Sequence, residues 1–215
     1  MHCPSIRALL LLPLVSRISS GQDIAPFTEE SAVKFDNLDA ETGLGRSSRS
    51  LDSLGAYSLL YYDNLAVVNI TPEVAGLKPF SRPNVLGYDT KLFSQGQQIM
   101  TSEFDDSITD YFDLKFFYFG CVLANVSYLP SIPIPCSLTV TGLREKEQVA
   151  EEIFLFESDG NPSNLAGAYP SEPGFKNVTR VTFDIMDANR GLDFAVLFDN
   201  FEYEAILKQG ASYEG

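Results

Sequence analysis

Acidic side chains in three copies of one short phrase are the first residues in this chain whose types and spacing suggest chemistry. An aromatic residue, Asp, Asn and an apolar residue stand at positions 35–38, 62–65 and 198–201. Carboxylate oxygens are preferred ligands of Ca²⁺. If the first and last copies meet in space, Asp36 and Asp199 can hold a structural Ca²⁺ together with backbone carbonyls. In the alternative interpretation the Asp-Asn pairs only form turns, because both side chains bond to their own backbone.

The middle copy has a different expected role. It stands between the apolar runs 59–61 and 66–68, so we expect Asp63 and Asn64 to form the turn of a β-hairpin.

A denser group of carboxylates follows in the centre of the chain. Paired carboxylates act as acid and base in glycoside cleavage, and alternate oxygen ligands suit Ca²⁺. The stretch lacks the ordered pattern and central Gly of an EF-hand loop, and a solvated acidic loop is the simpler interpretation. The group consists of Glu103, Asp105, Asp106, Asp110 and Asp113.

Histidine chemistry is excluded from the chain after its first residues, because the single histidine is His2. A Ser-His-Asp arrangement and a zinc site that needs imidazole are therefore both impossible there. We expect a protein that is not an enzyme. A glycosidase or lyase that works with carboxylates alone is the third hypothesis for its function.

Residues 1–20 have the pattern of a secretory signal peptide. Arg7 precedes an apolar run at 8–15, and a stretch suited to cleavage follows, which places the cut near Ser20. Eight apolar residues are far fewer than the roughly 20 that span a bilayer. No later segment is long and apolar enough to span a membrane, and the polar end at 208–215 argues against a lipid anchor. The expected product is a secreted protein without a membrane span.

Two cysteines remain after removal of this segment. Cys121 and Cys136 are expected to form one disulfide, since secretion exposes them to an oxidising compartment. A disulfide that closes a loop of about 15 residues would contribute about 3 kcal/mol to the free energy of unfolding in the chain-entropy model. Two free buried thiols are the alternative.

Asparagine-linked glycosylation is predicted at three sequons. They begin at Asn69, Asn125 and Asn177, and each lies at the end of an expected strand or in a loop.

The net charge is strongly negative. The formal charge of −14 becomes −16 when the first 20 residues, with Arg7 and Arg17 but no acid, are removed. Such a surface repels phosphate backbones, so we expect no nucleic-acid partner.

Short apolar runs separated by Gly, Pro, Asn and Asp predict an all-β protein. We expect an antiparallel β-sandwich of about eight to ten strands in one domain at 33–207, after a flexible segment at 21–32 and before a polar tail at 208–215. Helix propensity at 143–156 competes with a hairpin turning at 144–146, and the aromatic run at its end favours the hairpin. The expected strands are 33–37, 57–62, 65–69, 84–88, 97–101, 111–119, 136–142, 148–157, 178–185 and 193–205.

Aromatic side chains supply most of the core and a few candidate ligand contacts. The 16 Phe and 10 Tyr fall mainly inside the expected strands. Tyr88, Tyr128 and Tyr169 are placed in loops, where binding residues concentrate.

Several short phrases are spread along most of the chain after residue 20: 35–38, 57–67, 81–85, Cys121 with 136–142, and 198–201. Together they resemble a group of secreted β-sandwich proteins, common in fungi, whose domains are similar to galactose-binding-like jelly rolls and carbohydrate-binding modules. The resemblance implies a jelly roll with paired terminal strands and, in some relatives, a structural Ca²⁺ near them, but no activity. Tyr61 stands where such proteins often have Trp, which puts a sugar-stacking role there in doubt.

The leading hypothesis is a secreted, glycosylated, non-catalytic β-sandwich that binds an extracellular or cell-wall glycan or another extracellular surface. The second hypothesis is a secreted interaction protein, similar to an effector, with no glycan ligand.

Overall fold

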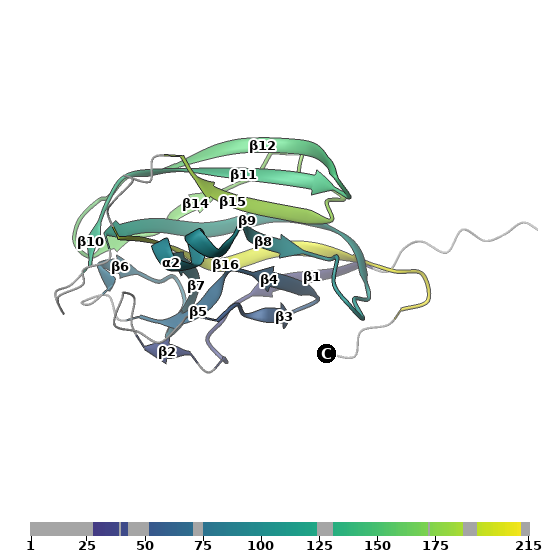
Figure 1. The fold of residues 1–215 in the computed structure, drawn as a ribbon, viewed down its shortest axis with the longest axis horizontal. Helices are drawn as coiled ribbons and strands as arrows, with labels where there is room; N and C mark the ends of the chain where they lie inside the picture. Colours follow the sequence, from purple (N-terminus) through teal and green to yellow (C-terminus); the bar gives the residue numbers. More distant parts are fainter. Residues whose placement is uncertain are drawn as a thin grey trace, which may run out of the picture.

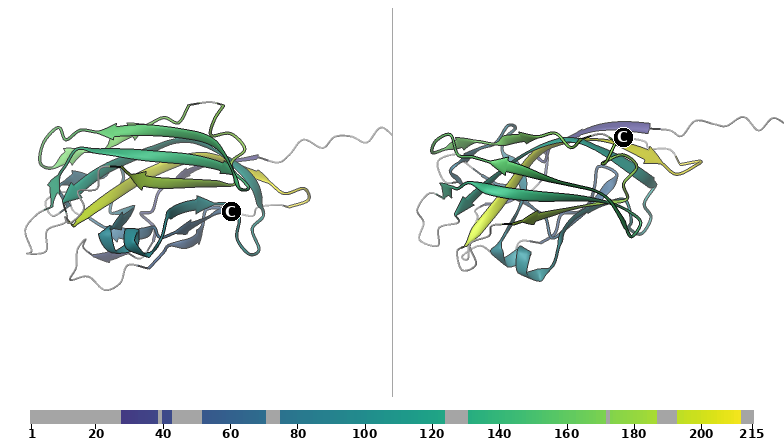
Figure 2. Two further views of the ribbon diagram at one scale, coloured as in Figure 1. Left: turned by 45° about the horizontal axis from the view of Figure 1, so that its top comes forward. Right: turned by 90° about the horizontal axis from the view of Figure 1, so that it is seen from above.

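Two mainly antiparallel β-sheets curl against each other around one core (Figures 1 and 2). The computed structural model describes residues 28–38, 40–42, 52–70, 75–123, 131–171, 173–186 and 193–211. Within these residues, no helix is long and apolar enough to cross a membrane. The predicted β-sandwich is confirmed.

The larger sheet has eight strands, and its centre is formed by the two longest, β9 and β16 (Figure 1). Its strand order is β10-β9-β16-β7-β5-β2, with β1 added on β16 and β14 added on β9. The bounds are β10 (Ile132–Pro133), β9 (Thr109–Leu123), β16 (Phe194–Leu207), β7 (Asn84–Asp89), β5 (Ala66–Asn69), β2 (Glu41–Thr42), β1 (Thr28–Val33) and β14 (Ala166–Ala168).

The second sheet has six strands in the order β12-β11-β15-β8-β4-β3. Its bounds are β12 (Glu147–Phe156), β11 (Cys136–Arg144), β15 (Arg180–Ile185), β8 (Gln98–Thr101), β4 (Leu60–Asp63) and β3 (Gly55–Tyr57). The strands β13 (Ser163–Asn164) and β6 (Leu77–Lys78) form a short parallel pair. The helix α2 (Thr90–Gln95) is capped by Asp89, whose side chain accepts bonds from two backbone amides of the first turn.

The burial of β16 agrees with the apolar pattern of its sequence. All residues from Phe194 to Phe201 are buried, and the pattern then alternates from Glu202 onward. The expected strand at 193–205 is therefore present, buried on both faces at its centre and amphipathic at its end. The hairpin prediction is confirmed as well, because β11 pairs with β12 around a turn at Glu145 and Lys146.

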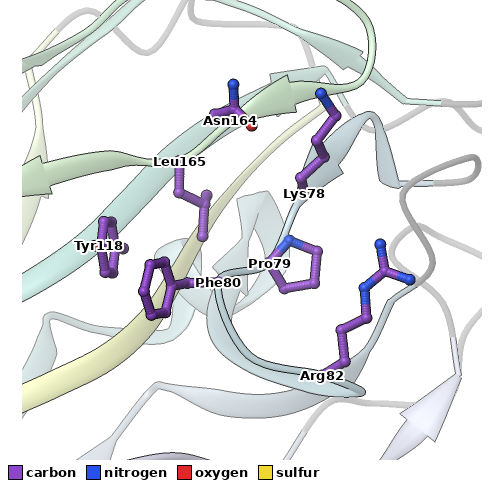
Figure 3. A pocket seen from close by; sticks show the side chains of 7 residues that line it. All are labelled: Lys78, Pro79, Phe80, Arg82, Tyr118, Asn164 and Leu165. Carbon is purple, nitrogen blue, oxygen red and sulfur yellow. The ribbon is translucent and has the colours of Figure 1, made fainter.

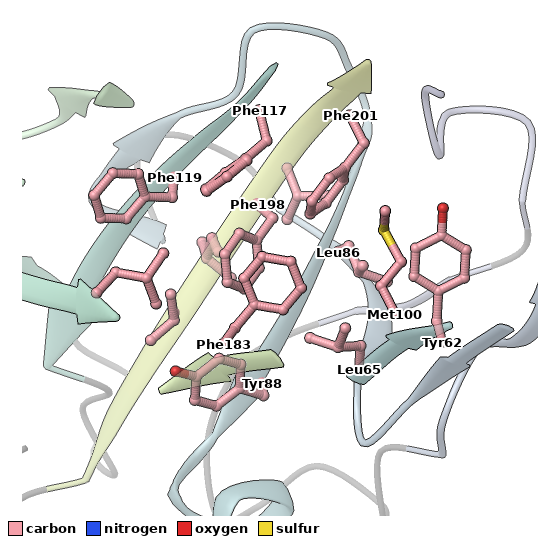
Figure 4. Packing of buried hydrophobic residues seen from close by; sticks show 14 of the residues in the cluster. Tyr62, Leu65, Leu86, Tyr88, Met100, Phe117, Phe119, Phe183, Phe198 and Phe201 are labelled. Atoms are coloured by element: carbon pink, nitrogen blue, oxygen red, sulfur yellow. The ribbon is translucent and has the colours of Figure 1, made fainter. Parts of the chain in front are cut away.

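Phenylalanine rings fill the space between the sheets (Figure 4). Phe117 of β9 stacks on Phe201 of β16 with ring centroids 5.4 Å apart. Phe183 of β15, from the opposite sheet, lies 5.0 Å from Phe198. The two central strands of the larger sheet therefore carry the contact between the layers.

A disulfide joins the two sheets at one end. Cys121 lies in β9 and Cys136 begins β11, and their sulfur atoms are bonded. The predicted pairing is confirmed.

The first strand begins earlier than expected. Thr28–Val33 forms β1, which pairs with β16 from Val33 opposite Phe201 to Thr28 opposite Ile206. The expected flexible segment to residue 32 and strand at 33–37 were therefore misplaced. The residues of β1 alternate between exposed and more buried positions. A strand with one solvated face tolerates polar side chains, and these polar residues are the reason that the sequence did not predict a strand here. Lys208, the first residue of the expected polar tail, donates from its backbone amide to the carbonyl of Ile108 and from Nζ to the carbonyl of Ser107.

The middle Asp-Asn copy does not form a hairpin turn. The strand β4 before it belongs to the six-stranded sheet, and β5 after it belongs to the eight-stranded sheet. Asn64 has φ of 54° and donates its side-chain amide to the carbonyl of Gln97. The same turn chemistry that suits a hairpin therefore serves a crossing between the two layers.

Candidate ligand-binding site

A pocket of about 310 Å³ opens on the outer side of the eight-stranded sheet (Figure 3). Three distant parts of the chain build it: β6 with the segment after it, the middle of β9, and the end of β13. The lining residues are Lys78, Pro79, Phe80, Arg82, Tyr118, Asn164 and Leu165.

Aromatic rings continue from this pocket across the sheet and are called here the aromatic strip, made of Phe80, Tyr118, Phe116 and Tyr169. Phe80 stacks on Tyr118 with centroids 4.5 Å apart and an interplanar angle of 15°. Tyr118 meets Phe116 edge to face at 4.7 Å, and Phe116 lies 4.6 Å from Tyr169. Phe80 is 64% exposed and Tyr169 72% exposed. The strip therefore presents large apolar faces to solvent.

The strand β9 places its aromatic residues on opposite faces. Phe117 and Phe119 join the core, whereas Phe116, although buried, lies outside the core cluster and contacts the strip. The strand β14 leaves space for these rings, because a Cβ atom on Gly167 would lie 3.1 Å from the Phe116 ring.

A bulge in β16 lies directly beside the strip. The register with β9 is irregular between Asp199 and Glu202, and Asn200 has φ of 47° there. Asn adopts this left-handed conformation more readily than most residues, and bulges redirect side chains. Asp199 thus lies opposite Tyr118 in the pairing of β16 with β9.

Asp199 fixes the segment that carries Phe80. Its carboxylate accepts bonds from the backbone amide of Ser81 at 2.8 Å and from the Ser81 hydroxyl at 3.0 Å. The amide of Asn200 donates to it as well. Burial raises the pKa of this carboxyl, while the bonds from Ser81 oppose the rise. The third Asp-Asn phrase therefore holds one wall of the pocket.

The first Asp-Asn phrase binds the same segment three residues further on. Asp36 accepts from the backbone amide of Asn84 at 3.2 Å. The buried side chain of Asn84 donates to the carbonyls of Phe35 and Leu38, and accepts from Asn69. Residues 81–84 are therefore tied from both sides by the outer two copies of the repeated phrase.

A third aspartate organises the opposite wall. Asp159 accepts from the backbone amide of Asn164 and from the hydroxyl of Ser163. These bonds, with the side-chain amide of Asn164, lower the pKa of Asp159 to about 2. The turn thereby presents Asn164 and Leu165 to the pocket (Figure 3).

The polar groups of the lining complete a mixed surface. No bond to the side-chain oxygen of Asn164 occurs within the described residues, so that oxygen is open to a donor. Burial raises the pKa of the Tyr118 phenol, with smaller contributions from Tyr169, Glu202 and Asp199, so it stays neutral in ordinary buffers. Stacking faces with a few hydrogen-bonding groups are the chemistry that recognises a sugar ring.

The predicted calcium ligands Asp36 and Asp199 both bind the segment 81–84. Asp36 accepts a bond from the backbone amide of Asn84. Asp199 accepts bonds from the amide and hydroxyl of Ser81 and from the amide of Asn200. No group of three or more His, Cys, Asp or Glu residues that could hold a metal occurs in the described ranges. The calcium site stays a prediction.

The carboxylates of the central acidic group have different environments. Glu103 pairs with Arg180 at 2.8 Å, and Asp113 accepts from the backbone amide of Asn177. Asp106 lies in a turn with φ of 62°. None of these acids lines the pocket.

Two of the three sequons can be placed. Asn177 is exposed, which suits a glycan, whereas Asn69 is half-buried at the end of β5 and donates to Asn84. Asn125 lies outside the described residues. Glycosylation stays a prediction at all three.

The candidate loop aromatics have different environments. Tyr169 is exposed and belongs to the aromatic strip, Tyr88 is fully buried in β7, and Tyr128 lies outside the described residues. The expectation for Tyr88 was wrong, because both faces of β7 are covered. Phe80 and Tyr118 were missed, and the signal that could have found Phe80 is its place between two prolines and two cations in 78–83.

No protein-family model matches the sequence, and no curated protein sequence matches it. Among solved structures, the chain is similar to the crystal structure of a DUF4465 family protein from Bacteroides caccae ATCC 43185. The two share 16% sequence identity with a TM-score of 0.49, over 84% of this chain and 100% of that chain.

Proposed function

We propose that this protein is a secreted, non-catalytic β-sandwich that binds carbohydrate at the pocket and along the aromatic strip. The observation that carries the proposal is the stacked pair of Phe80 and Tyr118, in which Phe80 is 64% exposed and Asp199 bonds the backbone at the next residue, Ser81. Exposed rings on a fixed backbone segment can stack on a sugar without the entropy cost of ordering them first.

The chemistry of the pocket favours binding over catalysis. Glycoside cleavage needs two carboxyl groups on either side of the scissile bond. The lining contains no Asp or Glu, and the oxygens of nearby Asp199 and Asp159 already accept several hydrogen bonds. The strip extends over three ring contacts of 4.5 to 4.7 Å, so it offers more than one stacking position.

Secretion is supported by the signal pattern in residues 1–20 and by the disulfide, which suits an oxidising compartment. The resemblance to carbohydrate-binding jelly rolls favours the same class of ligand.

A glycan array with the purified protein lacking residues 1–20 tests the proposal. We expect binding to at least one glycan, and we expect Phe80→Ala to weaken it about tenfold, since loss of one stacking contact costs about 1–2 kcal/mol. Leu155→Ala is the matched control, because Leu155 is 66% exposed on the other sheet. Array-wide absence of binding would reject the proposal and favour an interaction protein without a glycan ligand.

A further inference from the structure

Two positive charges lie at the pocket of a strongly acidic protein. Lys78 and Arg82 both line it, whereas the lining contains no acidic residue and the whole chain carries a formal charge of −14. Figure 3 shows the two cations on one side of Pro79 and the two rings on the other. The lining of the pocket is therefore positively charged, although the chain as a whole is negative.

Neither cation has an ion-pair partner among the described residues. By contrast, Lys115 contacts Glu204 at 2.9 Å, and Arg180 contacts Glu103 at 2.8 Å. Lys78 and Arg82 are exposed and form no ion pair or side-chain hydrogen bond with any residue of the described ranges. Their hydrogen-bond donors are free to meet a ligand.

The carboxylates that hold the two walls of the pocket already accept hydrogen bonds. The oxygens of Asp199 accept from Ser81 and Asn200 beneath the segment, and those of Asp159 accept from Ser163 and Asn164 at the other wall. These acids hold the pocket together and leave the cations unpaired. A ligand anion would find a partner here that the protein has not supplied.

We propose that the pocket selects sugars that carry an anionic group, a carboxylate or a sulfate ester. This inference rests on the proposed function and specifies its ligand. The sugar ring stacks on the face of Phe80, a hydroxyl group donates to the Asn164 oxygen, and the anion binds Arg82 and Lys78. The planar guanidinium suits such an anion, because its fork donates two parallel hydrogen bonds to paired oxygens.

Titration calorimetry tests this with two pairs of ligands, each pair having the same sugar chain in a charged and a neutral form. One pair is an oligogalacturonate and its fully methyl-esterified, neutral form, and the other is a sulfated galacto-oligosaccharide and its desulfated form. We expect tighter binding of the charged member in at least one pair, and the better pair identifies the anion. The preference should shrink at high salt, since exposed charges are screened.

Variants assign the preference to the two cations. We expect Lys78→Gln and Arg82→Gln each to weaken binding of the charged ligand about fivefold, with little effect on its neutral counterpart. Lys146→Gln, an exposed charge in the β11–β12 turn, is the matched control and should leave binding unchanged.

The outcomes separate this inference from the proposed function. Equal affinity for charged and neutral members, reduced by Phe80→Ala but not by the charge variants, overturns the anion preference and leaves carbohydrate binding intact. Failure of all four ligands and of the glycan array rejects both. Binding of an acidic peptide without any glycan also overturns the inference.

Discussion

Asp199 connects a feature of the sequence to the shape of the surface. It stands in a phrase that occurs three times, and its carboxylate holds the backbone that carries Phe80. The repeated phrase forms a different backbone structure at each place: a turn at Asp36, a crossing between the sheets at Asn64, and a bulge at Asn200. Asp and Asn share the chemistry, and the surrounding strands decide its use.

Removing the Asp199 carboxylate should cost stability. In Asp199→Ala the amides of Ser81 and Asn200 lose their acceptor, and we expect the free energy of unfolding to fall by about 1–3 kcal/mol. Denaturant unfolding measures this. Glu202→Ala, an exposed acid three residues along the same strand, should stay within about 0.5 kcal/mol of the parent. A variant at Asp199 as stable as the parent would show that the segment is held by other contacts.

Asp159 should make stability depend on acidity. Its pKa is about 2 in the folded protein, below the value of 3.8 for an unperturbed group, because Asn164 and Ser163 donate to the ionised form. The unfolded chain therefore binds the proton first, and this contribution, present above about pH 5, is lost as the pH falls toward 2. We expect the free energy of unfolding of Asp159→Asn to fall less steeply than that of the parent between about pH 5 and pH 2.

The measurement is a series of denaturant unfolding curves from pH 6 to pH 2. Asp105→Asn is the control, since that exposed carboxylate has no hydrogen-bond partner within the described ranges. A steeper loss in Asp159→Asn than in the parent would contradict the assignment. Asp199 acts with the opposite sign, because its raised pKa makes the native state relatively more stable as the pH falls through that pKa.

At the scale of elements, the disulfide connects the end of β9 to the start of β11 and so joins the two sheets. We expect the double variant of Cys121→Ala and Cys136→Ala to unfold with about 3 kcal/mol less free energy, since the unfolded chain regains the freedom of a loop of 15 residues. Chemical denaturation of the variant and of the parent with and without reductant checks this. Coincident curves would show that the bond is absent from the folded protein.

Strand positions were predictable where burial follows a simple pattern. The run at 194–201 is apolar on both faces and β11 with β12 contains β-branched and aromatic residues, so local chemistry agrees with the fold. The edge strand β1 could not be predicted in this way, because its polar sequence becomes a strand only through pairing with β16. Whether Asp63 and Asn64 turn within one sheet or cross between two is likewise decided by distant strands.

The pocket could not be derived from the sequence for a related reason. Its walls come from 78–82, Tyr118 and 164–165, which meet only because β14 pairs with β9 and β13 pairs with β6. Of its neighbours, Tyr169 was predicted as a candidate ligand contact, whereas Phe80 lies just before the phrase 81–85 and was not a candidate. Contacts over such separations in sequence carry no local signal.

The whole molecule has an aromatic core between its sheets and an aromatic surface on the outer side of the larger sheet. Phenylalanines between the sheets make the body stable, while rings on the outer side of the eight-stranded sheet stay exposed. A net charge of −14 keeps such a protein soluble, and the two cations at the pocket provide a local reversal of sign.

The central claim is that a sugar binds at the pocket, and a nuclear magnetic resonance titration tests it most directly. Oligogalacturonate, or its neutral form, would be added to the isotope-labelled protein lacking residues 1–20, and the backbone signals followed. The account predicts shifts concentrated at Lys78, Phe80, Arg82, Tyr118 and Asn164, with those at the β11–β12 turn unchanged. Signals that move only on the six-stranded sheet, or that do not move with any glycan bound on the array, would contradict it.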